Sequence, residues 1–252
     1  MSLLRGNAAV TLGVVRRLAG SRELLDGPLD DRPALIGNLR DLRRVNRFFG
    51  GTALSQSAVD VLITGRRDGF SLLDVGTGAA DIPVALLRAE AARGRDMRVV
   101  ALDTRGEILE AARQLDPGLG DHRDLQLATA DGRELPYQAN SFDLVHSSLV
   151  MHHLEPQDAI AFLREGRRVA RKGVVINDLV RGRAQWAAVW LLTRLFTRNR
   201  FTRHDAPMSV QRAYTRMELR ALLAAAGLQP VAEFVGPLRH RVAIAAVAIP
   251  DA

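Results

Sequence analysis

Two glycines that stand one residue apart, shortly after an acidic residue, are the pattern in this 252-residue sequence that best indicates binding chemistry. They belong to the segment LLDVGTGAAD at residues 72–81. Glycine adopts positive φ without cost, and its missing side chain lets a ligand approach the backbone closely. Apolar residues then recur at helical spacing over residues 82–92. Although such glycines also mark plain turns, the segment predicts a strand, a tight turn and the N-terminus of a helix that together face a ligand.

An acidic residue also ends the next apolar run. Asp103 follows residues 97–102, and it comes about thirty residues after the first strand, which is the spacing of a strand-helix-strand unit. A carboxylate at this strand end can accept hydrogen bonds from ribose hydroxyls. It could instead be a solvated turn residue or the cap of a helix over residues 106–114. Because both strand ends carry suitable residues, the pattern favours a nucleoside site.

Asp81 helps to distinguish a dinucleotide from another adenosine cofactor. Dinucleotide sites place a third glycine three residues after the second, where backbone amides meet a pyrophosphate, but Asp81 occupies that position here. Its carboxylate would repel a diphosphate and would suit a cofactor that carries an ammonium group. A third acid, Asp131 in the segment ADGRELP (130–136), lies between a third predicted strand and a fourth that begins near Ser141.

Taken together, these segments resemble those of the class I S-adenosylmethionine-dependent methyltransferases, in particular the small-molecule enzymes of the ubiquinone and menaquinone type. The resemblance covers roughly residues 70–180 and depends on LLDVGTGAAD, Asp103, ADGRELP and FDLVHSSLVMHHLEP (142–156). Ala80 is a departure, because many relatives have a third glycine there. The resemblance implies an α/β fold with a Rossmann-like seven-stranded, mostly parallel sheet flanked by helices, an N-terminal helical extension and a helical insertion after strand five.

The same resemblance implies roles for the first two strand ends. Gly76 and Gly78 would present backbone to the methionine part of S-adenosylmethionine. Asp74 would anchor the loop and reach the ammonium group, directly or through water. Asp103 would hold the ribose.

Later positions would surround the adenine and the sulfonium. Asp131 and the amide of Gly132 would face the adenine edge, unless Asp131 only starts a turn. Leu149 or Val150 would pack beside the sulfonium. The full set of candidate cofactor-binding residues is Asp74, Gly76, Gly78, Asp81, Asp103, Thr104, Asp131, Gly132, Ser148 and Asn46.

Residues 1–67 are expected to form an N-terminal helical cap, and residues 68–252 the methyltransferase core. Helices are predicted in the cap near residues 8–19, 33–48 and 53–64. Four arginines share one side of the second of these helices: Arg40, Arg43, Arg44 and Arg47. They form either a solvated face or, with Asn46, a group that reaches the cofactor carboxylate.

A helical insertion is expected at about residues 183–212, after a fifth strand near residues 173–177. Residues 184–196 are largely apolar, contain both tryptophans of the chain and lead into several arginines. Such a helix could pack as ordinary core, cover the acceptor pocket as a lid, or lie on a membrane surface. Beyond it, a helix and two closing strands are predicted at residues 215–226, 229–235 and 240–249.

Methyl transfer from a sulfonium asks mainly for alignment and the exclusion of water. A base is needed only if the acceptor loses a proton, and His152 and His153, just past the fourth strand, are the candidates. Both could equally be structural hydrogen-bonding residues. No metal site is predicted, because the histidines lack carboxylates at ligand spacing and adjacent histidines are poor joint ligands on one regular element.

Composition narrows the remaining possibilities. The chain has no cysteine, which excludes disulfides and thiolate metal sites. Its net charge of +7 comes almost wholly from arginine, with Lys172 the single lysine, which indicates compositional bias more than a nucleic-acid surface. Residues 1–19 lack a convincing signal-peptide pattern, and no apolar run has the length of a membrane span. A cytoplasmic protein, either a monomer or a homodimer, is therefore expected.

The sequence thus predicts a methyltransferase that acts on oxygen or carbon of a small hydrophobic or aromatic acceptor. An alternative is a noncatalytic S-adenosylmethionine-binding protein that regulates or scaffolds a partner. An RNA methyltransferase is disfavoured, because residues 147–150 read SSLV where amine-methylating enzymes of nucleic acids typically carry an Asn-Pro-Pro-Phe or Asp-Pro-Pro-Tyr type of motif.

Overall fold

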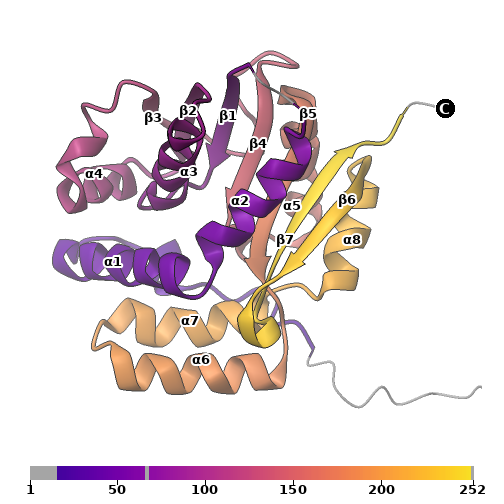
Figure 1. Ribbon diagram of the computed structural model, residues 1–252. Coiled ribbons are helices and arrows are strands. Elements are labelled where there is room, and N and C mark those ends of the chain that lie inside the picture. The colour runs from indigo at the N-terminus through magenta and orange to yellow at the C-terminus, as the bar shows by residue number, and fades with distance from the viewer. Residues whose placement is uncertain (1–15, 66–67, 251–252) are drawn as a thin grey trace, which may run out of the picture.

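The computed structural model describes residues 16–65 and 68–250, and its centre is a seven-stranded sheet (Figure 1). The strands lie in the order β3-β2-β1-β4-β5-β7-β6. The first five in this order are parallel, and β7 runs antiparallel to both of its neighbours. The strands are β1 (Phe70–Val75), β2 (Met97–Asp103), β3 (Leu125–Thr129), β4 (Phe142–Ser148), β5 (Ala170–Leu179), β6 (Leu228–Val235) and β7 (Arg241–Ala248).

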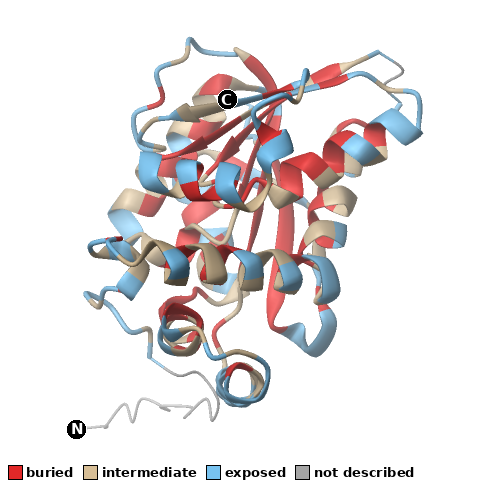
Figure 2. Ribbon diagram, turned by 90° about the vertical axis from the view of Figure 1, so that its left-hand side faces the viewer, coloured by how far each residue is buried: buried red, intermediate tan, exposed pale blue. Residues whose placement is uncertain are grey.

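Helices cover both faces of this sheet. Along β1 the two neighbours Leu72 and Leu73 point to opposite faces and enter different buried clusters. The cluster on one face includes residues of α2 (Gly51–Leu62), α3 (Asp81–Ala92) and α4 (Gly106–Leu115). The cluster on the other includes residues of α5 (Pro156–Val169) and α8 (Arg216–Ala225). Burial is accordingly concentrated in the strands and in the helix faces turned toward them (Figure 2).

Three further helices lie over the carboxyl ends of the parallel strands. They are α1 (Arg32–Phe48), α6 (Arg183–Phe196) and α7 (Arg200–Arg212), and Figure 1 shows them stacked beyond the edge of the sheet. α7 contacts the one-turn helix η3 (Met151–His153), which directly follows β4, while α1 contacts α3 and α4. These helices therefore surround the carboxyl ends of the parallel strands, where ligands bind in open α/β sheets. This end of the sheet is called the ligand edge below.

The seven-stranded Rossmann-like architecture expected from the sequence is confirmed. The expected helix at residues 8–19 is the main difference: residues 8–15 lie outside the described part of the chain, and residues 16–19 are not helical. Residues 16–31, here called the strap, instead run as mostly irregular chain with a single 3-10 turn, η1 (Leu24–Asp26). The division into a cap and a core stays a prediction.

α6 is not a core helix, so ordinary packing is the wrong interpretation of its apolar residues. Thr193 is its one buried residue. Large side chains are exposed along it, with exposed fractions of 42% for Trp190, 66% for Leu195 and 77% for Phe196. The lid and membrane-surface interpretations stay predictions. None of the helices in the described part of the chain combines the length and the apolar character needed to cross a bilayer.

A buried arginine at the start of β7 links the strand ends. The Arg241 guanidinium donates to Asn177 Oδ1 on β5 (2.6 Å), to Asn46 Oδ1 on α1 (2.8 Å) and to Ser148 Oγ at the end of β4 (2.5 Å). Burial lowers the pKa of Arg241 to about 10, while the charge of Asp178 opposes this shift. The side chain therefore stays protonated at neutral pH.

Replacing Arg241 with methionine is expected to destabilise the protein by about 3–5 kcal/mol, because removing one partner leaves buried polar and charged groups uncompensated. Urea unfolding followed by circular dichroism measures this. Arg239→Met, at an exposed neighbouring arginine, is the control and should change the free energy of unfolding by less than about 0.5 kcal/mol. Equal stability of the two variants would contradict the linking role of Arg241.

Candidate cofactor and acceptor site

The glycine loop after β1 has the backbone that its sequence predicts. Gly76 and Gly78 have positive φ, +76° and +55°. The amides of Gly76 and Thr77 both donate to the carbonyl of Leu102 at the end of β2, at 2.8 and 2.9 Å. A side chain at Gly76 would meet Val150 Cγ2 at 2.2 Å, whereas one at Gly78 would meet nothing within 4 Å. Gly76 is therefore needed for close packing, and Gly78 presents backbone to open space.

Asp103 connects this loop to the end of β2. Its Oδ2 accepts from the amide of Gly78 (3.1 Å), and its Oδ1 accepts from the amide of Arg105 (3.1 Å). The side chain is buried, and burial raises the pKa of Asp103. Each carboxylate oxygen can accept more than one hydrogen bond, so Asp103 retains capacity for a ligand hydroxyl beside the open space at Gly78.

Asp81, at the first position of α3, meets Asn46 from α1. Asn46 Nδ2 donates to Asp81 Oδ2 (3.1 Å), while Asn46 Oδ1 accepts from Arg241. Burial raises the pKa of Asp81. Asn46 therefore lies at the start of the helix that follows the glycine loop, while its contact with the cofactor carboxylate stays a prediction. Of the arginines on the same helix, Arg44 is exposed and pairs with Asp41 at 3.4 Å, and Arg43 pairs with Asp116 at 3.4 Å.

The Asp74 carboxylate is engaged inside the protein. His146 Nδ1 on β4 lies 2.5 Å from Asp74 Oδ1, and His146 Nε2 lies 2.7 Å from Ser55 Oγ on α2. Asn177 Nδ2 in turn donates to Ser55 Oγ (2.8 Å). This buried chain anchors the end of β1. A contact of Asp74 with a cofactor ammonium stays a prediction.

The remaining candidate cofactor-binding residues after β2 and β3 are Thr104, Asp131 and Gly132. Thr104 is exposed. Asp131 is exposed too and pairs with Arg133 at 2.8 Å, and this hydrogen bond lowers the pKa of Asp131. A side chain at Gly132 would lie 2.6 Å from Phe162 and 2.7 Å from Val75. Packing therefore accounts for Gly132, while its amide role stays a prediction.

Ser148 has a role inside the fold. Its hydroxyl accepts the hydrogen bond from Arg241 at the end of β4. The next residue, Leu149, adopts a positive φ of +59°, and its amide donates to the carbonyl of Asn177 (2.9 Å). Non-glycine residues in this region are often found at ligand sites. The backbone therefore turns sharply between β4 and the two histidines.

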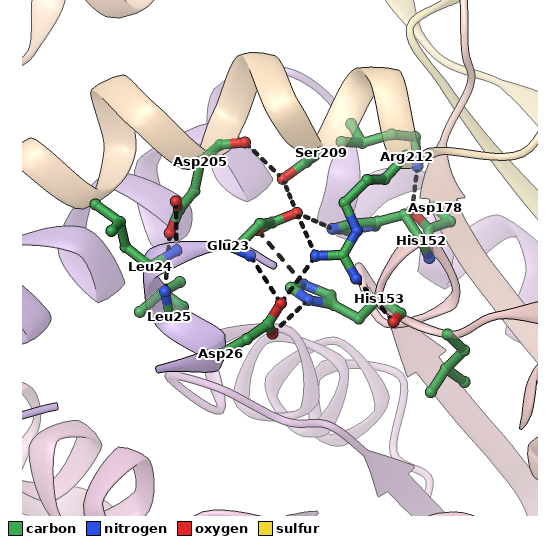
Figure 3. Close-up of polar contacts among 12 residues, drawn as sticks. Glu23, Leu24, Leu25, Asp26, His152, His153, Asp178, Asp205, Ser209 and Arg212 are labelled. Carbon is green, nitrogen blue, oxygen red and sulfur yellow. Dashed lines mark hydrogen bonds and ion pairs between the residues drawn. The ribbon is translucent and has the colours of Figure 1, made fainter. Parts of the chain in front are cut away.

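His152 and His153 lie together on η3, and each is oriented by a carboxylate (Figure 3). His152 Nδ1 lies 2.7 Å from Asp178 Oδ1, and His153 Nδ1 lies 2.9 Å from Asp26 Oδ1. Glu23 on the strap faces both rings, and burial raises its pKa to about 7. Sequence reasoning missed Glu23 and Asp26, because their segment has no motif that places it against the end of β4.

Hydrogen bonds from two directions hold the strap over the ligand edge. Arg105 Nη1, two residues beyond Asp103, donates to the carbonyls of Leu25 (3.0 Å) and Gly27 (2.6 Å). The amides of Leu24 and Leu25 donate to the Asp205 carboxylate on α7 at 2.8 and 3.1 Å (Figure 3). The strap thus extends from the candidate ribose acid toward the two histidines.

Two hollows border the helices α6 and α7. One, of about 200 Å³, lies at Trp186 and Val210. The other, of about 770 Å³ and more open, is lined by residues that include Arg44, Arg194 and Phe196. Neither hollow is lined by a candidate cofactor-binding residue. They lie at the helices that the lid prediction concerns.

Residues 73–176 match the family model described as a methyltransferase domain. This range contains the glycine loop, Asp103 and both histidines. The chain carries a class I S-adenosylmethionine-dependent methyltransferase domain.

Curated relatives of this methyltransferase domain include two enzymes named ubiquinone/menaquinone biosynthesis C-methyltransferase UbiE. The protein from Hahella chejuensis is 32% identical over 112 residues, which are 44% of this chain and 42% of that protein. The protein from Sinorhizobium fredii is 30% identical over 108 residues, 43% of this chain and 40% of that protein. The match thus spans about two fifths of the length of these relatives.

Solved structures share the fold over more of the chain. A SAM-dependent methyltransferase from Aquifex aeolicus has a TM-score of 0.59 at 19% identity and covers 84% of this chain and 97% of its own. An O-methyltransferase family 2 protein from Planctomyces limnophilus, in complex with apigenin, has a TM-score of 0.61 at 18% identity. The match covers 87% of this chain and 62% of that protein. The magnesium protoporphyrin IX methyltransferase from Synechocystis with bound SAH has a TM-score of 0.56 at 15% identity. The match covers 88% of this chain and 90% of that protein.

The residues of this methyltransferase domain fit S-adenosylmethionine. The Thr77 hydroxyl in the glycine loop is buried and has no hydrogen-bond partner within the described residues, and the neighbouring Gly78 faces open space. Asp103 supplies a carboxylate suited to ribose hydroxyls, and Asp81 supplies a second one suited to an ammonium group. A cofactor with both groups satisfies this donor and acceptor set.

Alanine at Asn46 is expected to destabilise the protein by about 2–3 kcal/mol, since it removes hydrogen bonds to two buried charged groups. Arg44→Ala, on the exposed side of the same helix, should cost less than about 1 kcal/mol. Thermal and urea unfolding of both variants measure the difference. A similar small effect for both would show that the contacts of Asn46 with Asp81 and Arg241 contribute little.

Proposed function

We propose that this chain transfers the methyl group of S-adenosylmethionine to a carbon or oxygen atom of a small hydrophobic or aromatic acceptor. The observation that carries the proposal is the buried Asp103 carboxylate, hydrogen bonded to the Gly78 amide beside open space. This arrangement supports a ribose-binding role for Asp103 and a ligand-facing role for Gly78, at adjacent strand ends. The match of residues 73–176 to a methyltransferase domain supports the same conclusion.

Each residue of the site has a defined task in this proposal. Asp103 holds the ribose hydroxyls, and the backbone at Gly78 lies against the methionine part. Asp81, kept in place by Asn46, faces the ammonium group. S-adenosylmethionine supplies an already activated methyl group, so the protein needs mainly to align the acceptor and to exclude water. α1, α7 and the strap, which lie over the strand ends, are suited to the second task.

The class of acceptor follows from two kinds of support. The sequence relatives are named as C-methyltransferases of ubiquinone and menaquinone biosynthesis, and a structural neighbour is an O-methyltransferase that was crystallised with apigenin. Both names refer to small molecules. The exposed apolar side chains of α6, among them Trp190 and Phe196, fit a hydrophobic acceptor that arrives from outside the core.

His152 is the proposed base for an acceptor that must lose a proton. Asp178 orients its ring through Nδ1, which leaves Nε2 as the proton acceptor. In the structure this Nε2 faces Glu23 at 3.9 Å. Acceptor binding must therefore displace the strap locally or use the space between these two groups.

The second hypothesis is a protein that binds the cofactor without transferring its methyl group. The same fold occurs in a solved structure described as a pericyclic reaction enzyme, with a TM-score of 0.56 at 16% identity. Turnover is therefore the measurement that separates the two hypotheses. Cofactor binding without methylated product across a panel of quinols and phenols would favour the second hypothesis.

Calorimetric titration tests the cofactor site. S-adenosylmethionine and S-adenosylhomocysteine are expected to bind, and NAD and ATP are not. Asp103→Ala should weaken binding by about 10-fold to 150-fold, because it removes a hydrogen bond between the ligand and a charged group. Asp121→Ala, at an exposed acid, is the matched control. Unaltered affinity in Asp103→Ala, or no binding by the wild type, would refute the proposed site.

The base role is tested separately with His152→Gln. Turnover with an accepted phenol should fall by about 100-fold or more, because general base catalysis contributes that amount, while the affinity for S-adenosylhomocysteine stays the same. His122→Gln, at a histidine distant in sequence from η3, serves as the control. Full turnover by His152→Gln would end the base proposal and leave cofactor binding unaffected.

A further inference from the structure

Three ligand atoms converge where the strap meets η3 (Figure 3). His152 Nε2 lies 3.9 Å from Glu23 Oε1, and His153 Nε2 lies 3.7 Å from Glu23 Oε2. The group of Glu23, His152 and His153 can place its donor atoms within 4.8 Å of one another. Glu23 and His152 are buried, with exposed fractions of 4% and 3%. These three residues are called the trio below.

The contacts of the other ring nitrogens indicate the tautomers of the two histidines. Nδ1 of His152 faces Asp178, and Nδ1 of His153 faces Asp26, so each neutral ring carries its proton on Nδ1. The two Nε2 lone pairs then face the Glu23 carboxylate. Separations of 3.7 and 3.9 Å exceed hydrogen-bond length. The trio therefore presents three electron-pair donors to a shared space.

Charged side chains surround the trio. The carboxylates of Glu23, Asp26, Asp178 and Asp205 all lie in the cluster of Figure 3. Arg212 lies on the strap side, 2.8 Å from Asp26 Oδ2 and 3.6 Å from Glu23 Oε1. Arg17 on the strap donates to the carbonyl of His152 (3.4 Å) and pairs with Glu155. Arg241 acts on Asp178 from the opposite side, and His204 pairs with Asp205 at its exposed edge. Four carboxylates thus lie close to the donor atoms of the trio.

We propose that Glu23, His152 and His153 bind a divalent transition-metal ion, with zinc the best match. Zinc takes two histidines and one glutamate in known sites, at about 2.0–2.2 Å from each donor atom, and donors at that distance lie on the order of 3–4 Å apart. The two histidine–glutamate separations, 3.9 and 3.7 Å, are in this range, and all three donor atoms lie within 4.8 Å of one another. Asp178 and Asp26 supply the carboxylates that orient metal-bound histidines. Three protein ligands leave a position open for a further ligand.

The contacts of Glu23 indicate which of its atoms binds the ion. Oε1 already accepts from Ser209 Oγ (2.9 Å), while Oε2 faces His153. Arg212 opposes a cation by charge, but its hydrogen bonds to Asp26 and to the carbonyl of His153 hold it beside the trio. Oε2 therefore has more free capacity for an ion, while Oε1 is the oxygen nearer to His152 Nε2.

The sequence alone predicts no metal, on the argument that adjacent histidines are poor joint ligands. η3 is a one-turn 3-10 helix, and the rings of His152 and His153 lie 4.3 Å apart at an angle of 36°. Both Nε2 atoms face the same glutamate as a result. The inference depends on these donors and not on methyl transfer. A bound ion would occupy the Nε2 atom proposed above as a base, so metal-loaded protein would have to activate its acceptor through the ion.

Metal titration of the untagged protein tests the site without using activity. The protein is stripped with a chelator and dialysed, and Co²⁺ or Zn²⁺ is then added, with Mg²⁺ as a comparison. We expect one equivalent of Co²⁺ or Zn²⁺ per chain by elemental analysis and visible d–d absorption from bound Co²⁺. Mg²⁺ should not compete, because it prefers oxygen ligands.

Variants then assign the ligands. Glu23→Gln and His153→Gln should each weaken Zn²⁺ binding at least about tenfold, and Asp26→Asn, which removes an orienting carboxylate, about 10-fold to 100-fold. His122→Gln is the matched control and should bind as the wild type does. Near-ultraviolet circular dichroism verifies folding, and the Co²⁺ spectrum of the wild type requires no variant. No stoichiometric uptake by the wild type, or uptake retained in both Glu23→Gln and His153→Gln, would overturn the proposal.

Discussion

The buried guanidinium of Arg241 is the interaction on which the ligand edge of this protein depends. It joins β7 to the ends of β4 and β5 and to α1, through Ser148, Asn177 and Asn46. Asn46 then donates to Asp81 at the start of α3. A buried charge needs partners on every side, so one side chain determines how three strand ends and two helices meet. The position of the candidate ammonium site follows from this constraint.

The strap is the second layer of that edge, and its contacts couple the two halves of the proposed site. Arg105 holds its carbonyls next to the candidate ribose acid, and Asp205 holds its amides on α7. Glu23 is thereby placed against His152 and His153. Residues next to the proposed cofactor site and next to the two histidines therefore contact one backbone segment.

The sequence predicted most of the core helices and strands, because each is marked by a pattern within a few consecutive residues. Apolar runs ending in an acid located β1 and β2, and positive φ at Gly76 and Gly78 follows from glycine chemistry. Other residues of the predicted site make contacts within the fold, and their roles toward a cofactor stay predictions. Asp131 is exposed and paired with Arg133, Gly132 is required by the packing of Phe162, and the apolar side chains of α6 are largely exposed. Composition and spacing alone do not distinguish these cases.

The sequence by itself determined which candidate functional residues follow which strands: a glycine loop after β1, an acid at the end of β2 and two histidines after β4. Each of these is a property of a few consecutive residues, so periodicity and residue type suffice to find it. Only the tertiary structure decided that Glu23 meets those histidines and that Arg241 meets Asn46, which lies 195 positions away. Such pairs form because the sheet brings distant strand ends to one edge, where buried charges must find partners, and no local pattern records which partner that will be.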